Sequence, residues 1–359
     1  RSRGSRALFN AGYSDDSFLI DTLRLNLDLH HTRTTQEFED PSGDTTDGLE
    51  TDTQVLLDAT GLSALYRWHR GVTGRAVHHV TILESIVRET AAVTDRLDGD
   101  AGVERSLRTG VALSVEDEIH LAGSRLIVSP SMRLERFSNR FEGEAGTDDS
   151  YVTARLGAAW HARNDLVVRA GAGRFKRQPS FLEIFGDQGS VKGGGAGLLP
   201  EEGVNYDIGM TWDPAPKGWL DRFHLERTLF SRQASELIQF ILTSQSQVIP
   251  RNTGRARVTG AELSTSLSLF SWFDGGFDYT WQVAEDRSDT FARGNDLPGR
   301  PRHELSARAA LRKSWGRPYY SFDYVGPNYF DAAAATAANS GRNRDQYRVP
   351  GRYLHGIGF

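Results

Sequence analysis

The sequence predicts an all-β fold, a transmembrane antiparallel β-barrel with about fifteen strands in these 359 residues. Two observations predict it: apolar and polar residues alternate along many segments, and short turn-like links alternate with long polar connections. No apolar stretch approaches the ~20 residues that a membrane helix needs. A membrane-spanning chain with this composition would therefore have to cross the bilayer with strands.

The alternation has a period of two residues. In the first clear segment Leu23, Leu25, Leu27 and Leu29 alternate with Arg24, Asn26, Asp28 and His30. Segments 107–121, 263–269 and 277–283 repeat the pattern. Because successive strand residues point to opposite faces, each segment has one apolar and one polar face.

A soluble β-sandwich or propeller also alternates, so three further details decide for the membrane. Several segments exceed the ~5 to 6 residues of an average strand, and their polar faces hold charge, Gly and Ser, as a wet lumen would. Aromatic residues cluster near segment ends, as in the interfacial girdles of membrane barrels: Tyr66, Trp68, Trp160, Trp212, Trp219, Trp272, Phe273, Trp315, Tyr319 and Tyr320. These details predict a bacterial outer-membrane location.

The connections follow the same plan. Tight turns are predicted at 122–124, 162–165, 213–218, 271–275 and 314–317, and long polar connections near 37–52, 138–150, 177–203, 286–302 and 327–347. Outer-membrane barrels have short periplasmic turns and long extracellular loops. Segment 17–36 then runs outward and the stretch around Ala7–Phe9 runs inward, so we expect further strands upstream.

Four motifs in the second half resemble those of TonB-dependent outer-membrane receptors. Arg174–Gly186 resembles the family's R-x-P-S-x-x-E-L-F-G segment, Leu198–Glu202 its N-P-x-L-x-P-E stretch, Asn252–Glu262 its N-x-G-x-A-x-x-x-G-x-E strand, and Leu297–His303 its L-P-x-x-P-x-H segment. The family's Asn-Pro is absent, and Gly193–Gly195 occupies that region. The resemblance covers about residues 165–359 by motif and the first half by architecture.

The resemblance implies a complete barrel of 22 strands with an N-terminal plug inside it. The sequence shows neither a plug-like segment nor a TonB box, so residues 1–359 are expected to form a partial receptor barrel without its plug. Val349–His355 resembles a segment that two further strands usually follow, so the last two strands are also expected to be missing. The alternative is that Tyr353, Ile357 and Phe359 form a terminal aromatic signal for barrel assembly.

The function that the resemblance implies is TonB-driven uptake of a scarce nutrient of the siderophore, cobalamin or glycan class. The implied partners are outer-membrane lipid, the TonB complex through the missing plug, and the small nutrient ligand. Two alternatives stay open: a plugless, passive porin-like channel, and a structural barrel that serves as a scaffold in a larger assembly. The full-length gene, a conductance measurement and co-purifying partners would separate the three.

Other function classes find no support in the sequence. The G-x-S-x-G, H-E-x-x-H and P-loop motifs are absent, so no enzyme, catalytic residue or cofactor is predicted. The pairs His30-His31 and His78-His79 place neighbouring rings on opposite strand faces, so no metal site is predicted. The net charge of -5 gives no sign of a nucleic-acid partner, and the lack of cysteine excludes disulfides and thiolate ligands.

Five residues are candidate ligand-binding residues. Arg169 shares a strand face with two glycines, where small side chains leave room, and Arg174, Arg177, Gln178 and Glu183 lie at the start of a long loop. In the family this region lines the wall and the outer vestibule, and an arginine fork suits carboxylate and phosphate groups. The alternative is that these side chains form wall salt bridges or contact the plug.

Two loop segments can be interpreted either as ordinary solvated loops or as ion-binding sites. The acidic run within 37–52 is expected to be a solvated loop, with a calcium site as the alternative because carboxylate oxygens suit that cation. The glycine-rich stretch Gly193–Gly197 is expected to be a loop tip. Phosphate binding is the alternative there, but the stretch precedes a strand rather than a helix.

Overall fold

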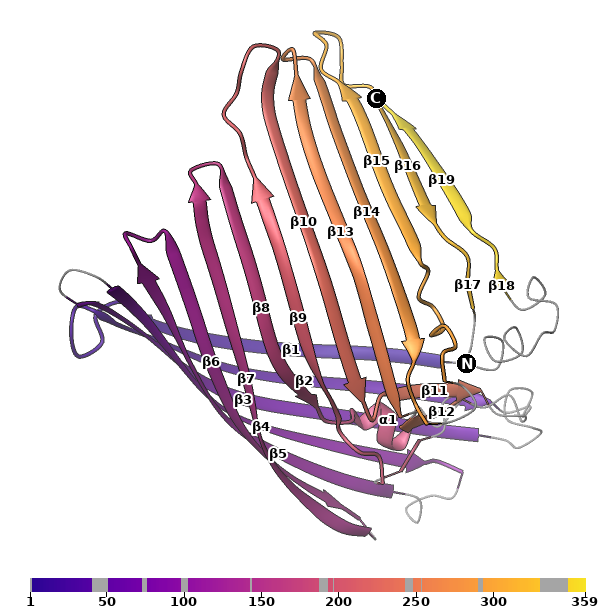
Figure 1. Ribbon diagram of the computed structural model, residues 1–359. Helices are drawn as coiled ribbons and strands as arrows, with labels where there is room; N and C mark the ends of the chain where they lie inside the picture. Colours follow the sequence, from indigo (N-terminus) through magenta and orange to yellow (C-terminus); the bar gives the residue numbers. More distant parts are fainter. Residues whose placement is uncertain are drawn as a thin grey trace.

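One curved antiparallel sheet dominates the computed structural model (Figure 1). The structure describes residues 2–40, 51–72, 76–97, 103–142, 144–186, 193–195, 197–242, 248–252, 254–289, 293–329 and 348–359. Most of the acidic run, residues 41–50, lies outside these ranges, as does part of the glycine-rich stretch. The two interpretations of each segment therefore stay predictions.

Fifteen strands form the sheet, which confirms the predicted fold class and the number of strands in this chain. They are β1 (Ser2–Asp15), β2 (Leu23–Asp40), β3 (Thr51–Val72), β4 (Ala76–Asp95), β5 (Val103–Leu121), β6 (Leu126–Phe141), β7 (Glu144–Arg163), β8 (Leu166–Arg177), β9 (Glu201–Trp212), β10 (Leu220–Ser235), β13 (Arg255–Leu269), β14 (Phe273–Asp286), β15 (His303–Leu311), β16 (Tyr319–Val325) and β19 (Arg352–Gly358). The short pairs β11 (Ile238–Leu242) with β12 (Val248–Asn252) and β17 (Asn328–Tyr329) with β18 (Arg348–Val349) stand apart from the sheet. The single helix in the described ranges is α1 (Phe181–Phe185).

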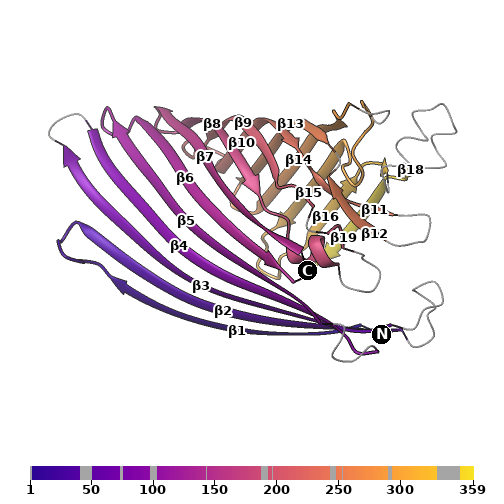
Figure 2. The same cartoon turned by 90° about the horizontal axis from the view of Figure 1, so that it is seen from below.

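Each strand pairs with the next one along the chain, except that β10 pairs with β13 because the β11–β12 hairpin intervenes. Within the described residues β1 pairs only with β2, and β19 pairs only with β16. Figure 2 shows that the strands sweep around a concave inner face, with α1 on its concave side. The stretch around Ala7–Phe9 lies in β1 and runs opposite to β2, as predicted.

The two ends of the sheet differ. At the end that we call the turn end, neighbouring strands are joined by links such as 122–125, 164–165 and 270–272. Ala122, Ser124, Phe270 and Ser271 adopt positive φ there, which closes the links within a few residues. The opposite, loop end carries α1 and the short hairpins. The predicted tight turns lie at the turn end, although β14 already begins at Phe273, and four of the five predicted long connections lie at the loop end.

One predicted loop is wrong. Residues 138–150 are not a long connection, because β6 and β7 stay paired from Leu126↔Trp160 as far as Phe141↔Glu144 and leave only 142–143 between them. The polar composition of 144–150 suggested a loop. At the loop end a strand projects beyond the apolar belt into water, so both of its faces are polar and the period-two signal disappears.

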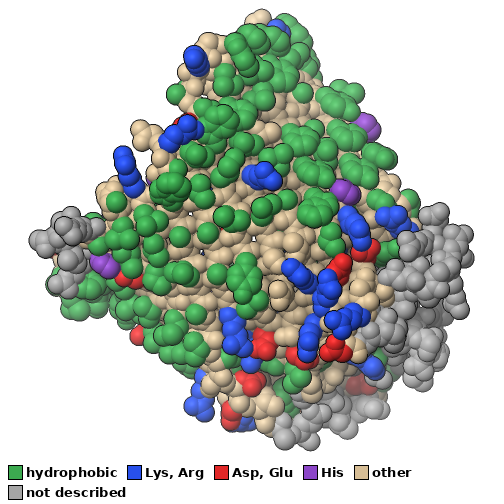
Figure 3. All heavy atoms as spheres, in the orientation of Figure 1, with side chains coloured by type: hydrophobic (Ala, Val, Ile, Leu, Met, Phe, Trp, Pro, Cys, Tyr) green, Lys and Arg blue, Asp and Glu red, His purple; other side chains and the backbone are tan. Residues whose placement is uncertain are grey.

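The two faces of the sheet have opposite polarity. On β5 the outer face presents Val111, Leu113 and Val115, which are 51%, 37% and 37% exposed, whereas Arg108 and Ser114 lie on the inner face. Figure 3 shows hydrophobic side chains spread widely over the outer face. An exposed apolar band of this size is what a lipid-facing barrel wall requires.

A single-layered sheet buries few side chains, and two clusters of buried side chains lie where loop-end segments fold onto the inner face. Phe181 and Ile184 of α1 pack with Ala91, and Leu297 packs with Ala256 and Ala284. The part of the chain that the structure describes contains no helix long and apolar enough to cross a bilayer.

Candidate functional site

The short helix α1 lies against the inner face of β3–β6 at the loop end. Its first turn is closed by a capping box: the Ser180 hydroxyl accepts a hydrogen bond from the Glu183 amide, and the Glu183 carboxylate accepts one from the Ser180 amide. Phe181 and Ile184 are buried against Ala91, with Leu57 and Phe141 around them. The segment that carries the first family-like motif is therefore held inside the wall rather than free above it.

An ion-pair cluster ties this segment to two strands. Arg177, at the end of β8, donates from Nη1 and Nη2 to the two carboxylate oxygens of Glu183 at 2.9 Å each. Its Nε donates to Oε2 of Glu201, the first residue of β9, at 2.7 Å. The other Glu201 oxygen accepts from the Ile238 amide at 2.8 Å. One guanidinium therefore joins β8, α1 and β9, and Glu201 extends the link to the β11–β12 hairpin.

The Glu183 carboxylate stays ionised in this cluster. Burial alone would raise its pKa, but the hydrogen bonds from Arg177 and Ser180 outweigh burial and hold the pKa below its usual value. The side chain is only 8% exposed, so the charge depends on these partners. The arrangement stabilises the folded loop and leaves little of the Glu183 carboxylate open to a ligand.

Arg108 of β5 supports the same segment from below. It is buried, donates from Nε to Asn139 Oδ1 at 2.8 Å and from Nη2 to the Pro179 carbonyl at 2.8 Å, and lies 4.8 Å from the Phe181 ring centroid. The Glu89 carboxylate, 3.8 Å away, balances its charge. Sequence reasoning missed this residue, because nothing in its alternating surroundings distinguishes it from other polar residues on the inner face.

The structure brings two of the five candidate residues together and separates the others. Arg177 and Glu183 form the bidentate pair, and Gln178 Nε2 lies 3.5 Å from Asp149 Oδ2. Arg169 lies nearer the turn end on the inner face, where it donates to Thr211 Oγ1 at 2.7 Å. Gly173 and Arg177 of β8 lie on the inner face, so Arg174, which is an odd number of residues from each, lies on the outer face. There it pairs with Glu202 at 3.0 Å.

Much of the charge on the inner wall is paired across or along strands. Arg133 donates to Ser114 on the neighbouring strand at 2.8 Å and to Glu135 on its own strand at 2.7 Å. Arg169 lies 3.9 Å from Glu226, and both side chains are about half exposed. These pairs form a salt-bridge ladder along the wall, and their exposed members face the lumen, where a polar solute could meet them.

Three histidines form a row on the inner face near the turn end. The Nδ1 atoms of His69 and His79 lie 2.5 Å apart, and the ring centroids of His79 and His120 lie 4.8 Å apart. The row depends on strand register, which sets His69 opposite His79, so sequence reasoning that compared only adjacent histidines missed it. Among the described residues, no group of three His, Cys, Asp or Glu side chains is placed to hold a metal ion.

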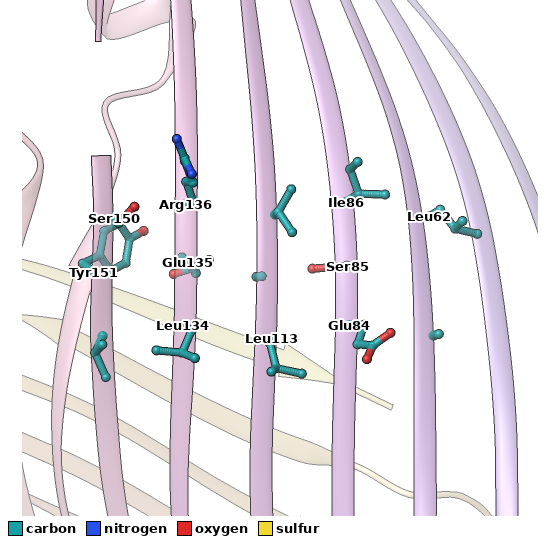
Figure 4. Close-up of a pocket in the computed structure, with 14 residues that line it drawn as sticks. Leu62, Glu84, Ser85, Ile86, Leu113, Leu134, Glu135, Arg136, Ser150 and Tyr151 are labelled. Atoms are coloured by element: carbon teal, nitrogen blue, oxygen red, sulfur yellow. The ribbon is translucent and has the colours of Figure 1, made fainter. Parts of the chain in front are cut away.

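A hollow of about 830 Å³ lies on the wall formed by β3–β7 (Figure 4). Leu62, Ile86, Leu113 and Leu134 line it, and all four belong to the outer, apolar face. Figure 4 shows these side chains projecting from a row of neighbouring strands. These side chains place the hollow on the lipid-facing side of the wall, and Glu84 and Arg136 also line it.

Comparisons with known proteins agree with this architecture. The family model described as "TonB dependent receptor-like, beta-barrel" matches residues 1–358. Solved structures with the same fold include the unliganded ferric citrate transporter FecA (TM-score 0.75, 16% identity, 99% of this chain and 54% of that one) and the copper transporter OprC (0.74, 15%, 99% and 57%). BauA, the ferric preacinetobactin receptor of Acinetobacter baumannii, is also similar (0.70, 13%, 99% and 55%). No curated protein sequence matches the chain.

A lipid-facing apolar wall around a polar lumen defines an outer-membrane β-barrel. The chain belongs to the TonB-dependent receptor family, as the four motifs predicted, and lies in the outer membrane of Gram-negative bacteria. It spans about half the length of the solved receptors that it resembles. The total of 22 strands, the plug and the closing strands stay predictions.

Proposed function

We propose that this chain forms the wall of a receptor that takes up a scarce nutrient by TonB-driven transport. The observation that carries the proposal is the inner face at the loop end, where α1 is pinned over a charged wall by Arg177, Glu183 and Arg108. A loop fixed inward in this way narrows the outer mouth of the lumen. A narrowed mouth suits a solute that is bound before it is moved.

The proposal includes a plug domain elsewhere in the protein, through which the TonB complex would act. The family match to a TonB-dependent receptor barrel supports it, since the resemblance of the four motifs implies a plug. The nutrient class is a siderophore, cobalamin or glycan. The solved relatives named as ferric citrate, ferric preacinetobactin and copper transporters favour a metal-bearing solute within that range.

The proposed ligand contacts on the inner face are Arg169, Arg177 and Gln178. Glu183 is proposed to act through Arg177, because its carboxylate is nearly buried. The Arg169 side chain is 53% exposed, more than that of Arg177 (44%) or Glu183 (8%). Arg174 is proposed only as an indirect contributor, because its side chain lies on the outer face. An exposed guanidinium on the lumen wall would attract a carboxylate-bearing or phosphate-bearing solute.

The test uses a strain that carries the full-length gene. Its growth is measured on ferric siderophores, cobalamin or glycans as the supplied nutrient, with and without functional TonB. Uptake that is lost without TonB and is reduced in Arg169→Ala supports the proposal. Arg136→Ala, on the outer face, is the matched control and should leave uptake unchanged. Equal solute flux with and without TonB, accompanied by ion conductance, would support the passive channel instead.

A further inference from the structure

Four arginines lie on the outer face at the loop end of β8, β13 and β14: Arg174, Arg255, Arg257 and Arg287, the outer arginine cluster. Strand register brings them together. Arg174 of β8 is opposite Val204 of β9, which is opposite Gln233 of β10. Gln233 is in turn opposite Arg257 of β13, so Arg174 and Arg257 lie on one row across the sheet. Figure 3 shows Lys and Arg side chains, interspersed with acidic ones, gathered between the hydrophobic field and the grey segments.

The cluster surrounds a hollow of about 590 Å³. Four arginines and one glutamate, Glu202, line it, so the lining carries a formal charge of +3. Gln233 and Ser235 add neutral hydrogen-bonding groups. The hollow is therefore suited to an anion, and it differs from the apolar hollow on β3–β7.

The four guanidinium groups are not equally engaged. Arg174 pairs with Glu202 at 3.0 Å, Arg287 pairs with Glu285, and Arg255 lies 3.8 Å from Asp289. Arg257 is exposed, and within the described part of the chain it has no ion pair or hydrogen bond through its side chain. Glu285 is the cross-strand neighbour of Arg257, but its carboxylate pairs with Arg287. Four guanidinium groups thus stand beside three carboxylates, and the fork of Arg257 is a ready partner for an external anion.

The position of the cluster identifies the kind of anion. On the same face, the next row toward the turn end consists of Tyr206, Ser231 and Thr259. The row after that, still closer to the turn end, consists of Ile208, Leu229 and Ala261. Ile208 and Leu229 are 53% and 44% exposed and belong to the lipid-facing band. The arginines thus lie directly above the apolar band on the loop-end side, at the level of lipid headgroups.

We propose that the outer arginine cluster binds the phosphate group of an outer-leaflet lipid, with Arg257 as the central contact. Arginine forks donate paired hydrogen bonds to phosphate oxygens. The lipid chains would continue from the phosphate over Ile208 and Leu229. A soluble phosphate would gain nothing from that apolar surface, whereas a lipid would contact the arginines with its phosphate and the apolar surface with its chains. This inference requires only the membrane placement of the wall and not the proposed transport activity.

The experiment uses the full-length receptor in nanodiscs of phosphatidylcholine with or without phosphatidic acid, and native mass spectrometry to count retained lipid. The wild type should retain phosphatidic acid in preference to phosphatidylcholine. Each arginine removed should weaken this preference about fivefold, so the double variant R255A/R257A should lose about 25-fold. Arg227→Ala, on the same face but within the apolar band, is the matched control and should keep the preference.

Two outcomes would overturn the proposal. If R255A/R257A retains phosphatidic acid like the wild type while its unfolding on heating is unchanged, the cluster is not the binding site. Inorganic phosphate is also titrated alone to find the concentration at which it half-saturates the site. If phosphate at that concentration displaces the bound lipid, the site recognises free phosphate rather than a lipid. If R255A/R257A fails to fold, Arg257→Gln replaces it, and that variant should reduce retention about fivefold.

Discussion

Arg177 at the end of β8 holds both carboxylate oxygens of Glu183 in α1 at 2.9 Å, and its third donor, Nε, reaches Glu201. This pair fixes an inward-folded loop to the wall of the barrel. The relationship is specific to arginine, because only a planar fork can contact two carboxylates in this geometry. It therefore gives a direct way to loosen the loop without touching the membrane-spanning part of the strands.

Arg177→Ala should release the segment 178–186 from the wall. The loss of a partner for the nearly buried Glu183 costs about 1–3 kcal/mol of local stability. Hydrogen–deuterium exchange of this segment should accelerate about 5- to 160-fold, while β5 and β6 stay protected. Arg136→Ala is the control, and unchanged exchange in Arg177→Ala would show that the pair does not hold the loop.

Acid should loosen the same segment through Glu183. Its pKa is lowered in the folded state, so the carboxylate contributes stability that is fully present above its unfolded pKa of ~4.3 and is lost as the pH falls through the folded pKa. Protease resistance of 178–186 should stay constant from neutral pH to about 5 and fall below about 4. In Glu183→Gln this acid-dependent step should disappear, and a step of the same size in that variant would assign it to another group.

Arg108→Ala should weaken the support beneath α1. The change removes donors to Asn139 and to the Pro179 carbonyl and leaves a gap under the Phe181 ring. Leaving these buried acceptors unpaired costs about 1–3 kcal/mol, and the gap adds to that. The expected result is a lower midpoint in urea unfolding from vesicles, and Arg133→Ala, which is less buried, should cost less.

The two faces of β5 should respond oppositely to a new charge. Leu113→Arg places a guanidinium in the lipid-facing band and should destabilise the barrel by about 2–4 kcal/mol near the midplane. Ser114→Glu places a charge in the wet lumen beside Arg133, where it should change stability by less than about 1 kcal/mol. Both values come from unfolding of the full-length protein in vesicles, and equal costs would contradict the assignment of the faces.

The sequence predicts the wall better than the loops because the wall obeys a local rule. The alternation of Leu113 with Ser114 reports which face meets lipid, and the turn residues around Gly123 mark where strands reverse. Both signals lie within a few neighbouring residues. The rule fails at 144–150, where β7 leaves the membrane and both of its faces are polar.

The site is less predictable because it depends on contacts between distant segments. The sequence indicated Arg177 and Glu183 by motif, yet only the fold shows that they bind each other. Arg108 carries no local signal, since its role depends on Pro179 and Phe181, more than seventy residues away in the chain. The histidine row and the outer arginine cluster both depend on strand register, which the alternation does not reveal.

Single-cysteine labelling of β5 tests the central claim most directly, because the chain contains no cysteine of its own. Leu113→Cys and Ser114→Cys are compared in the full-length receptor in intact outer membranes, with a water-soluble maleimide and a lipid-soluble one. The assigned wall predicts that Ser114→Cys reacts with the water-soluble reagent and Leu113→Cys only with the lipid-soluble one. Equal reaction of both positions with the water-soluble reagent would contradict a membrane barrel with a polar lumen.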